Sequence, residues 1–519
     1  MFWYQACDTS AEFEDLLRDE GRKVGCVLKF FSAAPADHLR VPLGENRTSS
    51  RVEECAKTLQ QLSETLSDEP QVAFALLRTC AAPAVKLRLL ARCRADIDWG
   101  DVDARLMQVM HTIVGGSAPL PDEVQTQCQI ALDKGGCGVQ TMAQYARAFF
   151  QDAALKREAF VRAQCDDAMR VLGIATDAPA SGATAMAVEH VEDVEERLQK
   201  QWLAAAEQRG DEAAMHAHDL SDKWTGDFLR AFPRPVGSEG RLEPEVFRRA
   251  LRNRLAMRNV VPQRGGECAD SDTDSSGSAA AIEEADEVRM KCPRCSVMMA
   301  PDHRHAVGCA AQRNTRHNAV RDVIGEYVGE AGLKWKREQS LAQLARQTGT
   351  EVAATDDAPD VDSDDEGGGM DRPCDLLIFH RVSDAPTTTL AYDVTLALPD
   401  SAKGVAGTRA RGGPDWQRAI RLARERKEKA RCKIESLGAG YEPLVFSSNG
   451  RPDERTVRVL TGFAKDWALA HGCSVGDAMM ILRIRTSIAI HRWNGEILRS
   501  ICGEGLGAET VFAGRARMI

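Results

Sequence analysis

The chain has 519 residues, enough for three or more domains, and its 43% hydrophobic content without an apolar run near 20 residues predicts a globular protein with no membrane span. The first residues lack the basic and apolar stretches of a secretory signal, so we expect the 16 cysteines to be thiols or zinc ligands in a reducing, intracellular compartment. The net charge of −10 conceals a basic C-terminal region, because residues 401–519 hold 21 Lys and Arg against 12 Asp and Glu. This excess would suit nucleic-acid phosphates, although a solvated basic helix face explains it equally well.

The N-terminal half is predicted to be mainly α-helical. Residues 1–50 form an uncertain segment with one amphipathic stretch, whereas residues 51–262 show helical periodicity. Apolar side chains recur there at steps of three and four, as in Val102, Leu106, Val109 and Ile113 and in Val191, Val194 and Leu198. A last helix is expected from Glu243 to Met257. Residues 263–288 are too polar and small to bury a core, so we expect a disordered acidic linker.

Residues 289–315 carry a candidate zinc knuckle. Its ligands would be Cys292, Cys295, His305 and Cys309, with His303 as a competing imidazole. Four protein ligands leave no open position for water, so this Zn²⁺ would be structural and not catalytic. The knuckle would present Arg294, Arg304 and Arg313 to a phosphate backbone. The alternative is a loop of reduced cysteines without metal.

Residues 316–519 are predicted to form an α/β domain. A helix begins near His317 and has apolar positions at Val320, Ile324 and Val328. An acidic insertion at residues 348–370 follows, and its aspartates lack the ordered spacing of a metal-binding loop, which favours disorder. Beyond the insertion the pattern is strand, strand, helix, strand, helix, which is typical of a mixed α/β domain.

Two aspartates lie within the first two of these strands. Asp375 opens a short apolar run and Asp393 interrupts another, and a hairpin between His380 and Thr389 would bring the strands side by side. An ionised carboxylate among β-forming residues is costly unless a cation or another partner compensates it. Carboxylates on adjacent strands can hold Mg²⁺ or Mn²⁺ for phosphodiester cleavage. We therefore predict that both aspartates are catalytic metal ligands, while Glu338 is a further candidate ligand or an ordinary solvent-facing glutamate.

The lysine that such a nuclease uses must come from elsewhere, because Thr395 stands two residues after Asp393. A helix expected from Asp415 to Leu437 has an apolar stripe whose rhythm of three and four is interrupted by Lys427. Lys427 should therefore face the sheet and act in catalysis, unless it only extends from the core to the surface. Lys429 lies about 200° further round the helix and is the second candidate.

The same helix is strongly basic. We expect three of its side chains to bind nucleic acid, namely Arg424, Arg431 and Lys433.

These motifs, in this order, resemble the C-terminal part of site-specific non-LTR retrotransposon proteins. The resemblance rests on the zinc knuckle, Arg316-His-Asn318, Arg372-Pro-Cys-Asp375, Asp393-Val-Thr395, the basic helix, and Pro443-Leu-Val-Phe446 followed by Gly450. Upstream, residues 74–78 with Pro83, residues 135–139 and residues 247–255 resemble the thumb and linker that follow the reverse transcriptase of those elements.

The resemblance implies a restriction-enzyme-like endonuclease of the PD-(D/E)XK superfamily, which nicks target DNA so that reverse transcription can begin. It also implies DNA and element RNA as partners and a nuclear location. Three departures stand out. Cys374 separates Pro373 from Asp375, the helix has no tyrosine after its lysines, and the chain has no Tyr/Phe-x-Asp-Asp motif. Reverse transcriptase activity is therefore not expected, and by this resemblance the chain is a fragment or a remnant of an element.

Three hypotheses follow from the sequence. The first is a DNA endonuclease in which Asp375 and Asp393 bind Mg²⁺ and Lys427 assists attack by water. The second is an inactive nucleic-acid-binding remnant, whose affinity for phosphates would survive with a steep dependence on salt. The third is a helical interaction protein in which both aspartates are structural.

Overall fold

The computed structural model describes the following residues, and every structural statement below concerns them: 37–38, 41–42, 48–82, 99–115, 119–149, 151, 190–209, 221–231, 240–257, 313–349, 374–380, 388–397 and 416–501. The predicted linker at 263–288 and the zinc-knuckle ligands lie outside them, as does most of the acidic insertion at 348–370. Within the described part, no helix is both long enough and apolar enough to cross a membrane.

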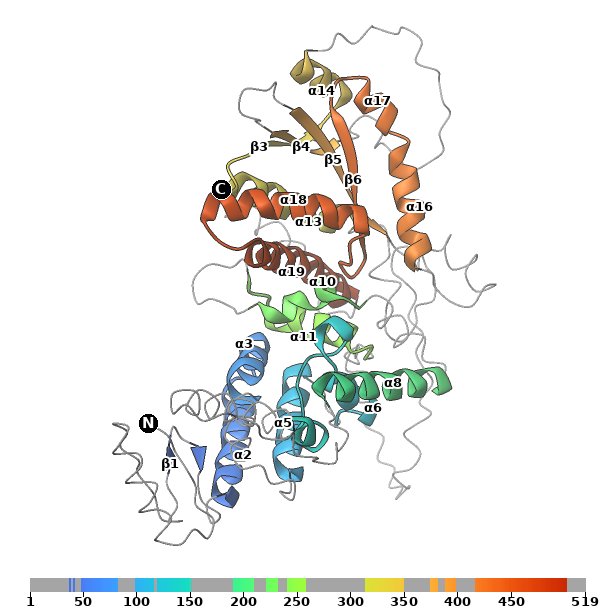
Figure 1. Ribbon diagram of the computed structural model, residues 1–519. Coiled ribbons are helices and arrows are strands. Elements are labelled where there is room, and N and C mark those ends of the chain that lie inside the picture. The colour runs from blue at the N-terminus through green and yellow to red at the C-terminus, as the bar shows by residue number, and fades with distance from the viewer. Residues whose placement is uncertain are drawn as a thin grey trace, which may run out of the picture. The chain divides into compact units, whose positions relative to one another are not determined.

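The structure is mainly helical and contains one four-stranded mixed sheet together with a two-stranded one. The chain divides into two compact units, of which the first comprises residues 1–67, 76–112 and 139–197 and the second comprises residues 68–75, 113–138 and 198–519. Figure 1 shows the elements of both. Those before residue 260 are β1 (Asp37–His38), β2 (Val41–Pro42), α2 (Thr48–Thr65), α3 (Pro70–Leu76), η2 (Leu77–Ala81), α5 (Gly100–Val114), α6 (Asp122–Gln129), η3 (Leu132–Lys134), α8 (Val191–Arg209), α10 (Lys223–Gly226), η4 (Asp227–Arg230) and α11 (Pro244–Arg254).

The first unit is helical, as the periodicity predicts. In α5, the side chains of Val102, Leu106 and Val109 are buried at the expected spacing. The Asp103 carboxylate on the same helix accepts the backbone N–H groups of Met142 and Ala143, each at 2.7 Å. These bonds satisfy two donors at the start of a helical turn and join it to α5.

The second unit contains the mixed sheet, and its order is β3-β4-β5-β6. Its elements beyond residue 300 are α13 (Arg313–Glu330), β3 (Lys334–Gln339), α14 (Leu341–Thr348), β4 (Cys374–His380), β5 (Thr388–Ala397), α16 (Trp416–Glu428), α17 (Arg431–Glu435), β6 (Gly440–Ser447), α18 (Glu454–His471) and α19 (Val475–Ile501). β3 pairs antiparallel with β4, and β4 pairs antiparallel with β5, as the predicted hairpin between β4 and β5 requires. β5 and β6 are parallel and connect through α16 and α17.

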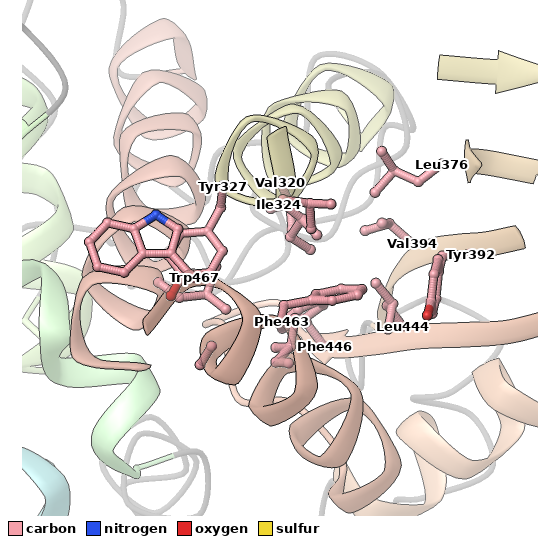
Figure 2. Packing of buried hydrophobic residues seen from close by; sticks show 14 of the residues in the cluster. Val320, Ile324, Tyr327, Leu376, Tyr392, Val394, Leu444, Phe446, Phe463 and Trp467 are labelled. Carbon is pink, nitrogen blue, oxygen red and sulfur yellow. The ribbon is translucent and has the colours of Figure 1, made fainter. Parts of the chain in front are cut away.

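Helices cover both faces of this sheet. Because side chains alternate along a strand, one face carries Leu376, Ile378, Val394, Leu396, Leu444 and Phe446, and this face packs against α13, α18 and α19 (Figure 2). The other face carries Leu377, Ala391, Tyr441 and Val445, which pack against side chains of α14, α16 and α17. Asp375 and Asp393 lie two residues from Leu377 and Ala391 along their strands, so both belong to the second face.

Helix α19 also packs against segments from earlier in the chain. The Phe228 ring of η4 stacks on the His491 ring with centroids 4.1 Å apart, and the Phe228 N–H bonds to Ser487 Oγ at 3.0 Å. Gly495 leaves room for α11, because a Cβ there would lie 2.6 Å from the Val246 carbonyl oxygen. Burial lowers the pKa of His491 to about 3, so this imidazole is neutral in the core.

Two features of the sheet region differ from the sequence prediction. Strand β3 was not expected, because its sequence Lys-Trp-Lys-Arg-Glu-Gln is mostly charged, which suits an edge strand with solvent beside it. The single helix predicted from Asp415 to Leu437 is wrong, because α16 ends at Glu428 and α17 begins at Arg431. At this break the Lys427 carbonyl accepts the Ala430 N–H at 3.1 Å, which is a tightened final turn.

Candidate active site

Asp375 and Asp393 lie on neighbouring strands and interact directly. The backbone pairing between β4 and β5 ends at Leu376 and Tyr392. Past this pair, the Val394 N–H donates to Asp375 Oδ2 at 2.8 Å and not to a backbone carbonyl. This bond fixes the Asp375 carboxylate against β5, where it contacts the carboxyl group of Asp393. Asp393 is only 4% exposed, so two acidic groups share a largely buried position.

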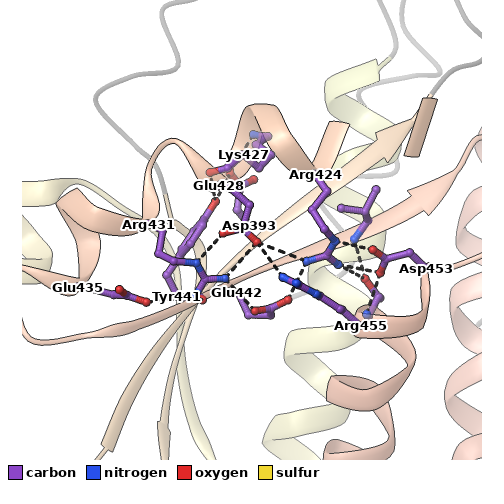
Figure 3. A network of polar contacts seen from close by, with 12 residues as sticks. Asp393, Arg424, Lys427, Glu428, Arg431, Glu435, Tyr441, Glu442, Asp453 and Arg455 are labelled. Carbon is purple, nitrogen blue, oxygen red and sulfur yellow. Dashed lines mark hydrogen bonds and ion pairs between the residues drawn. The ribbon is translucent and has the colours of Figure 1, made fainter. Parts of the chain in front are cut away.

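Lys427 faces this pair, as its place in the helix predicts. Helix α16 packs Ile420 and Ala423 against the sheet, and Lys427 follows one turn later on the same side. Its Nζ lies 2.9 Å from Asp393 Oδ2, and the side chain is 31% exposed (Figure 3). Lys429, the second candidate, is exposed to solvent.

Tyr441 completes the contacts of Asp393, and the sequence analysis did not identify it. It lies on β6, opposite Ala391 in the parallel pairing, on the face that α16 and α17 cover. Its hydroxyl is 3.2 Å from Asp393 Oδ2 and 3.1 Å from the carbonyl oxygen of Lys427 (Figure 3). The sequence feature that could have identified Tyr441 is the alternation of side chains along the strand, which places it on the same sheet face as Asp393.

His317 contacts the other aspartate. It lies in the second turn of α13, not at the helix start that the sequence suggested, and its Nε2 is 3.0 Å from Asp375 Oδ1. Val320 and Ile324 of the same helix are fully buried against the sheet, which orients the helix. Glu338, the further candidate ligand, instead pairs with Arg321 and has a positive φ of 40°.

The electrostatics separate the two carboxyl groups. Burial raises the pKa of Asp375, but the hydrogen bond and charge of His317, together with the hydrogen bond of Asp393 and the charge of Lys427, hold that pKa below the ordinary value. Burial, and then the charge of Asp375, raise the pKa of Asp393 well above the ordinary value, against the opposing effect of Lys427. Once Asp375 is ionised, ionisation of the adjacent Asp393 is unfavourable. A bound cation would stabilise the pair with both carboxylates ionised.

Two of the arginines predicted to bind nucleic acid lie in a network of ion pairs beside this site (Figure 3). Arg424 contacts Asp453 at 2.5 Å and Glu442 at 2.7 Å, and it is only 11% exposed. Arg431 contacts Glu428 at 2.5 Å and Glu442 at 3.0 Å. The two guanidinium groups thus fasten α16 and α17 to β6.

The other predicted site residues fall in different places. Lys433 is exposed on α17, and Arg313 is the first residue of α13. The remaining predicted residues, Arg294, Arg304, Cys292, Cys295, His305 and Cys309, lie outside the described residues, and their roles stay predictions.

The donor set fits a divalent cation in part. Asp375 contacts both His317 and Asp393, although in the described ranges no three His, Cys, Asp or Glu side chains are arranged to hold a metal ion. The side chains are held by hydrogen bonds and ion pairs to one another, so a cation would replace some of these bonds. Comparison with known proteins gives no assignment, because no family model and no curated protein matches this chain.

Proposed function

We propose that this protein is a metal-dependent DNA endonuclease of the PD-(D/E)XK type. The observation that carries the proposal is the convergence of Asp375, Asp393 and Lys427 from two strands and a helix, with Lys427 Nζ 2.9 Å from Asp393 Oδ2. Their proximity supports the proposal, as does the mixed sheet with helices on both faces.

Each residue has a distinct part in the proposed reaction. A bound Mg²⁺ or Mn²⁺ would polarise the scissile phosphate and lower the pKa of the attacking water. Asp375 and Asp393 would hold it, and the Val394 N–H fixes Asp375 for that purpose. Lys427 would place a positive charge where negative charge develops on the phosphate, and Tyr441 anchors both Asp393 and the end of the helix that carries Lys427.

DNA is the proposed substrate because of the charges around the site. Helices α16 and α17 expose Arg421, Arg426, Lys429 and Lys433, which lie outside the ion-pair network and could contact phosphates. The resemblance to retrotransposon proteins adds element RNA as a partner, a structural Zn²⁺ at residues 289–315 and a nuclear location, all of which we propose on that ground.

The second candidate function is an inactive remnant that only binds nucleic acid, and the same exposed basic side chains favour it. The two functions are distinguished by following both binding and nicking of supercoiled plasmid with the full chain, in Mg²⁺ or Mn²⁺ and in EDTA. The endonuclease predicts metal-dependent nicking that Asp393→Asn abolishes while DNA affinity is kept. Salt-sensitive binding without any nicking would instead establish the remnant.

A further inference from the structure

We propose that His317 is a positioning residue of the candidate endonuclease, whose Nε2–H fixes the orientation of the Asp375 carboxylate. In this role the imidazole acts through Asp375 alone and contacts neither the DNA nor an ion. The inference rests on the proposed function, because it gives a part in that reaction to a residue that the sequence analysis did not select.

The first support is that both oxygens of Asp375 are held, and by different elements. His317 Nε2 on α13 is 3.0 Å from Asp375 Oδ1, and the Val394 N–H on β5 donates to Asp375 Oδ2 at 2.8 Å. The terminal torsion of an aspartate has a broad distribution, so a single hydrogen bond leaves the carboxylate free to turn, whereas donors on both oxygens fix its plane. His317 therefore supplies the second of the two restraints on Asp375.

The second support is the way in which α13 is anchored beside His317. The preceding residue, Arg316, is buried, and its guanidinium donates to Asn494 Oδ1 of α19 at 2.6 Å. Asn494 is buried as well, and its Nδ2 donates to the carbonyl oxygen of Ser448, directly after β6, at 3.0 Å. Val320, one turn later on α13, is fully buried in the core. These contacts join α13 to α19 and to the end of β6, so the backbone that carries His317 has little freedom.

The third support is the kind of donor that α13 offers to Asp375. Arg321 lies one turn after His317, but its guanidinium pairs with Asp322 at 2.9 Å and with Glu338. The donor from α13 to Asp375 is therefore an imidazole N–H. In its neutral form this group orients a carboxylate without cancelling the negative charge, whereas a guanidinium would remain as a competing cation. Asp375 is thus held in place and keeps the charge that the proposed reaction needs.

The test compares two variants of the full chain that separate the N–H group of His317 from its ring. His317→Gln keeps an N–H donor at a similar reach and loses the ring, whereas His317→Phe keeps a ring and loses the donor. We expect His317→Phe to lower the single-turnover rate of plasmid nicking in Mn²⁺ by about ten- to hundredfold, and His317→Gln to stay within about threefold of the unaltered protein. The DNA affinity of both variants should change by less than about twofold, because His317 acts on Asp375 and not on DNA.

Nitrogen NMR of the imidazoles in EDTA measures the same hydrogen bond without any cleavage. The signals of His317 are assigned by their absence in His317→Gln. At about pH 8 we expect a proton on Nε2 that exchanges slowly with water, and faster exchange in Asp375→Ala, which removes the acceptor. An Nε2 without a proton in the unaltered protein would overturn the proposal, because Asp375 would then receive no hydrogen bond from His317.

The outcomes separate this inference from the proposed function. Slow nicking by His317→Phe together with near-normal nicking by His317→Gln supports the positioning role. The reverse order would show that the ring matters only for packing, and equal rates in the two variants would overturn the role of the N–H as well; in both cases the endonuclease itself stands. If the unaltered protein does not nick DNA, the proposed function fails, and the positioning role fails with it.

Discussion

Tyr441 links three parts of the candidate site through one hydroxyl. Its ring is buried on β6, while its hydroxyl reaches both Asp393 Oδ2 and the carbonyl oxygen of Lys427, where α16 ends. The last carbonyls of a helix lack partners within the helix, so this hydroxyl also helps to end α16 at the correct residue. Tyr441 therefore positions the lysine and the carboxylate relative to each other.

Tyr441→Phe should reduce nicking about tenfold while leaving the fold intact. The variant keeps the buried ring and loses only the hydroxyl, so we expect about 1 kcal/mol less stability. Cleavage rates at saturating Mn²⁺, together with urea unfolding, check both parts. A cleavage rate equal to that of the unaltered protein would show that the hydroxyl serves only the helix end.

The raised pKa of Asp393 predicts how stability depends on pH in the absence of metal. A carboxyl whose pKa is higher in the folded state binds its proton more tightly there, so stability is lost as pH rises above the ordinary Asp value towards the raised one. Asp393→Asn does not ionise and should therefore be more stable than the unaltered protein at pH 8. At pH 4 the two should differ little.

Unfolding of both proteins in EDTA across this pH range measures the effect. Saturating Mn²⁺ should reverse the order at pH 8, because the ion stabilises the ionised Asp393 and binds the variant weakly. Equal stabilities at every pH in EDTA would mean that the two carboxylates do not repel each other as described.

Individual residues of the site could be predicted to different extents. Helical periodicity placed Lys427 towards the sheet and Lys429 towards solvent, and the structure agrees. His317 and Tyr441 were missed because their contacts depend on pairing between elements far apart in sequence. Arg424 shows the converse difficulty, since a basic helix pattern does not reveal which guanidinium faces carboxylates of a neighbouring strand.

At the scale of elements, the ion-pair network holds α16 against β6 and α18. Arg424 contacts Glu442 of β6 and Asp453, and the latter also caps α18 by accepting the Thr456 N–H at 2.8 Å. Lys427 lies three residues after Arg424 on α16. The network therefore helps to set the distance between Lys427 and the aspartates.

Arg424→Ala should cost about 2 kcal/mol of stability and also slow cleavage, because two partly buried carboxylates lose their partner. Arg421→Ala is the matched control on the same helix, since Arg421 is 68% exposed and its nearest carboxylate is 4.0 Å away. The control should change stability by less than about 0.5 kcal/mol. Urea unfolding of the two variants checks the difference, and equal losses would contradict the structural role of Arg424.

The elements themselves were predictable where apolar patterns are strong. The strands that carry Asp375 and Asp393 and the strand around Pro443–Phe446 appear as expected, because each is a buried apolar run. Strand β3 has no such apolar run, and its strand conformation comes from its antiparallel pairing with the edge of β4. At the break between α16 and α17, Arg431 forms ion pairs with Glu428 and Glu442, and no periodicity predicts these contacts.

At the scale of the whole molecule, the sheet region shares its core with earlier segments of the second unit. α19 contacts η4 through Phe228 and α11 through Gly495, and Trp224 of α10 belongs to the main hydrophobic cluster. The sequence predicts a linker at residues 263–288 between these segments and the sheet region, and no sequence pattern indicates that they pack together. The domain predicted to begin at residue 316 therefore does not include α10, η4 and α11.

A fragment of residues 316–519 should therefore be less stable than one of residues 221–519. The shorter fragment exposes the side of α19 that includes His491 and Gly495, and it removes Trp224 from the core. We expect a lower urea midpoint and binding of a hydrophobic dye. Identical midpoints would indicate that the sheet region folds independently of α10, η4 and α11.

The most direct measurement of the central claim is nicking of supercoiled plasmid by the full chain in Mn²⁺, with the unaltered protein and three variants purified in parallel. The variants are Asp375→Asn, Lys427→Ala and Lys429→Ala. The account predicts open-circular product from the unaltered protein and from Lys429→Ala, with at least about a hundredfold loss in the other two. No product from the unaltered protein, or equal product from all four, would contradict the assignment of Asp375, Asp393 and Lys427 as an endonuclease site.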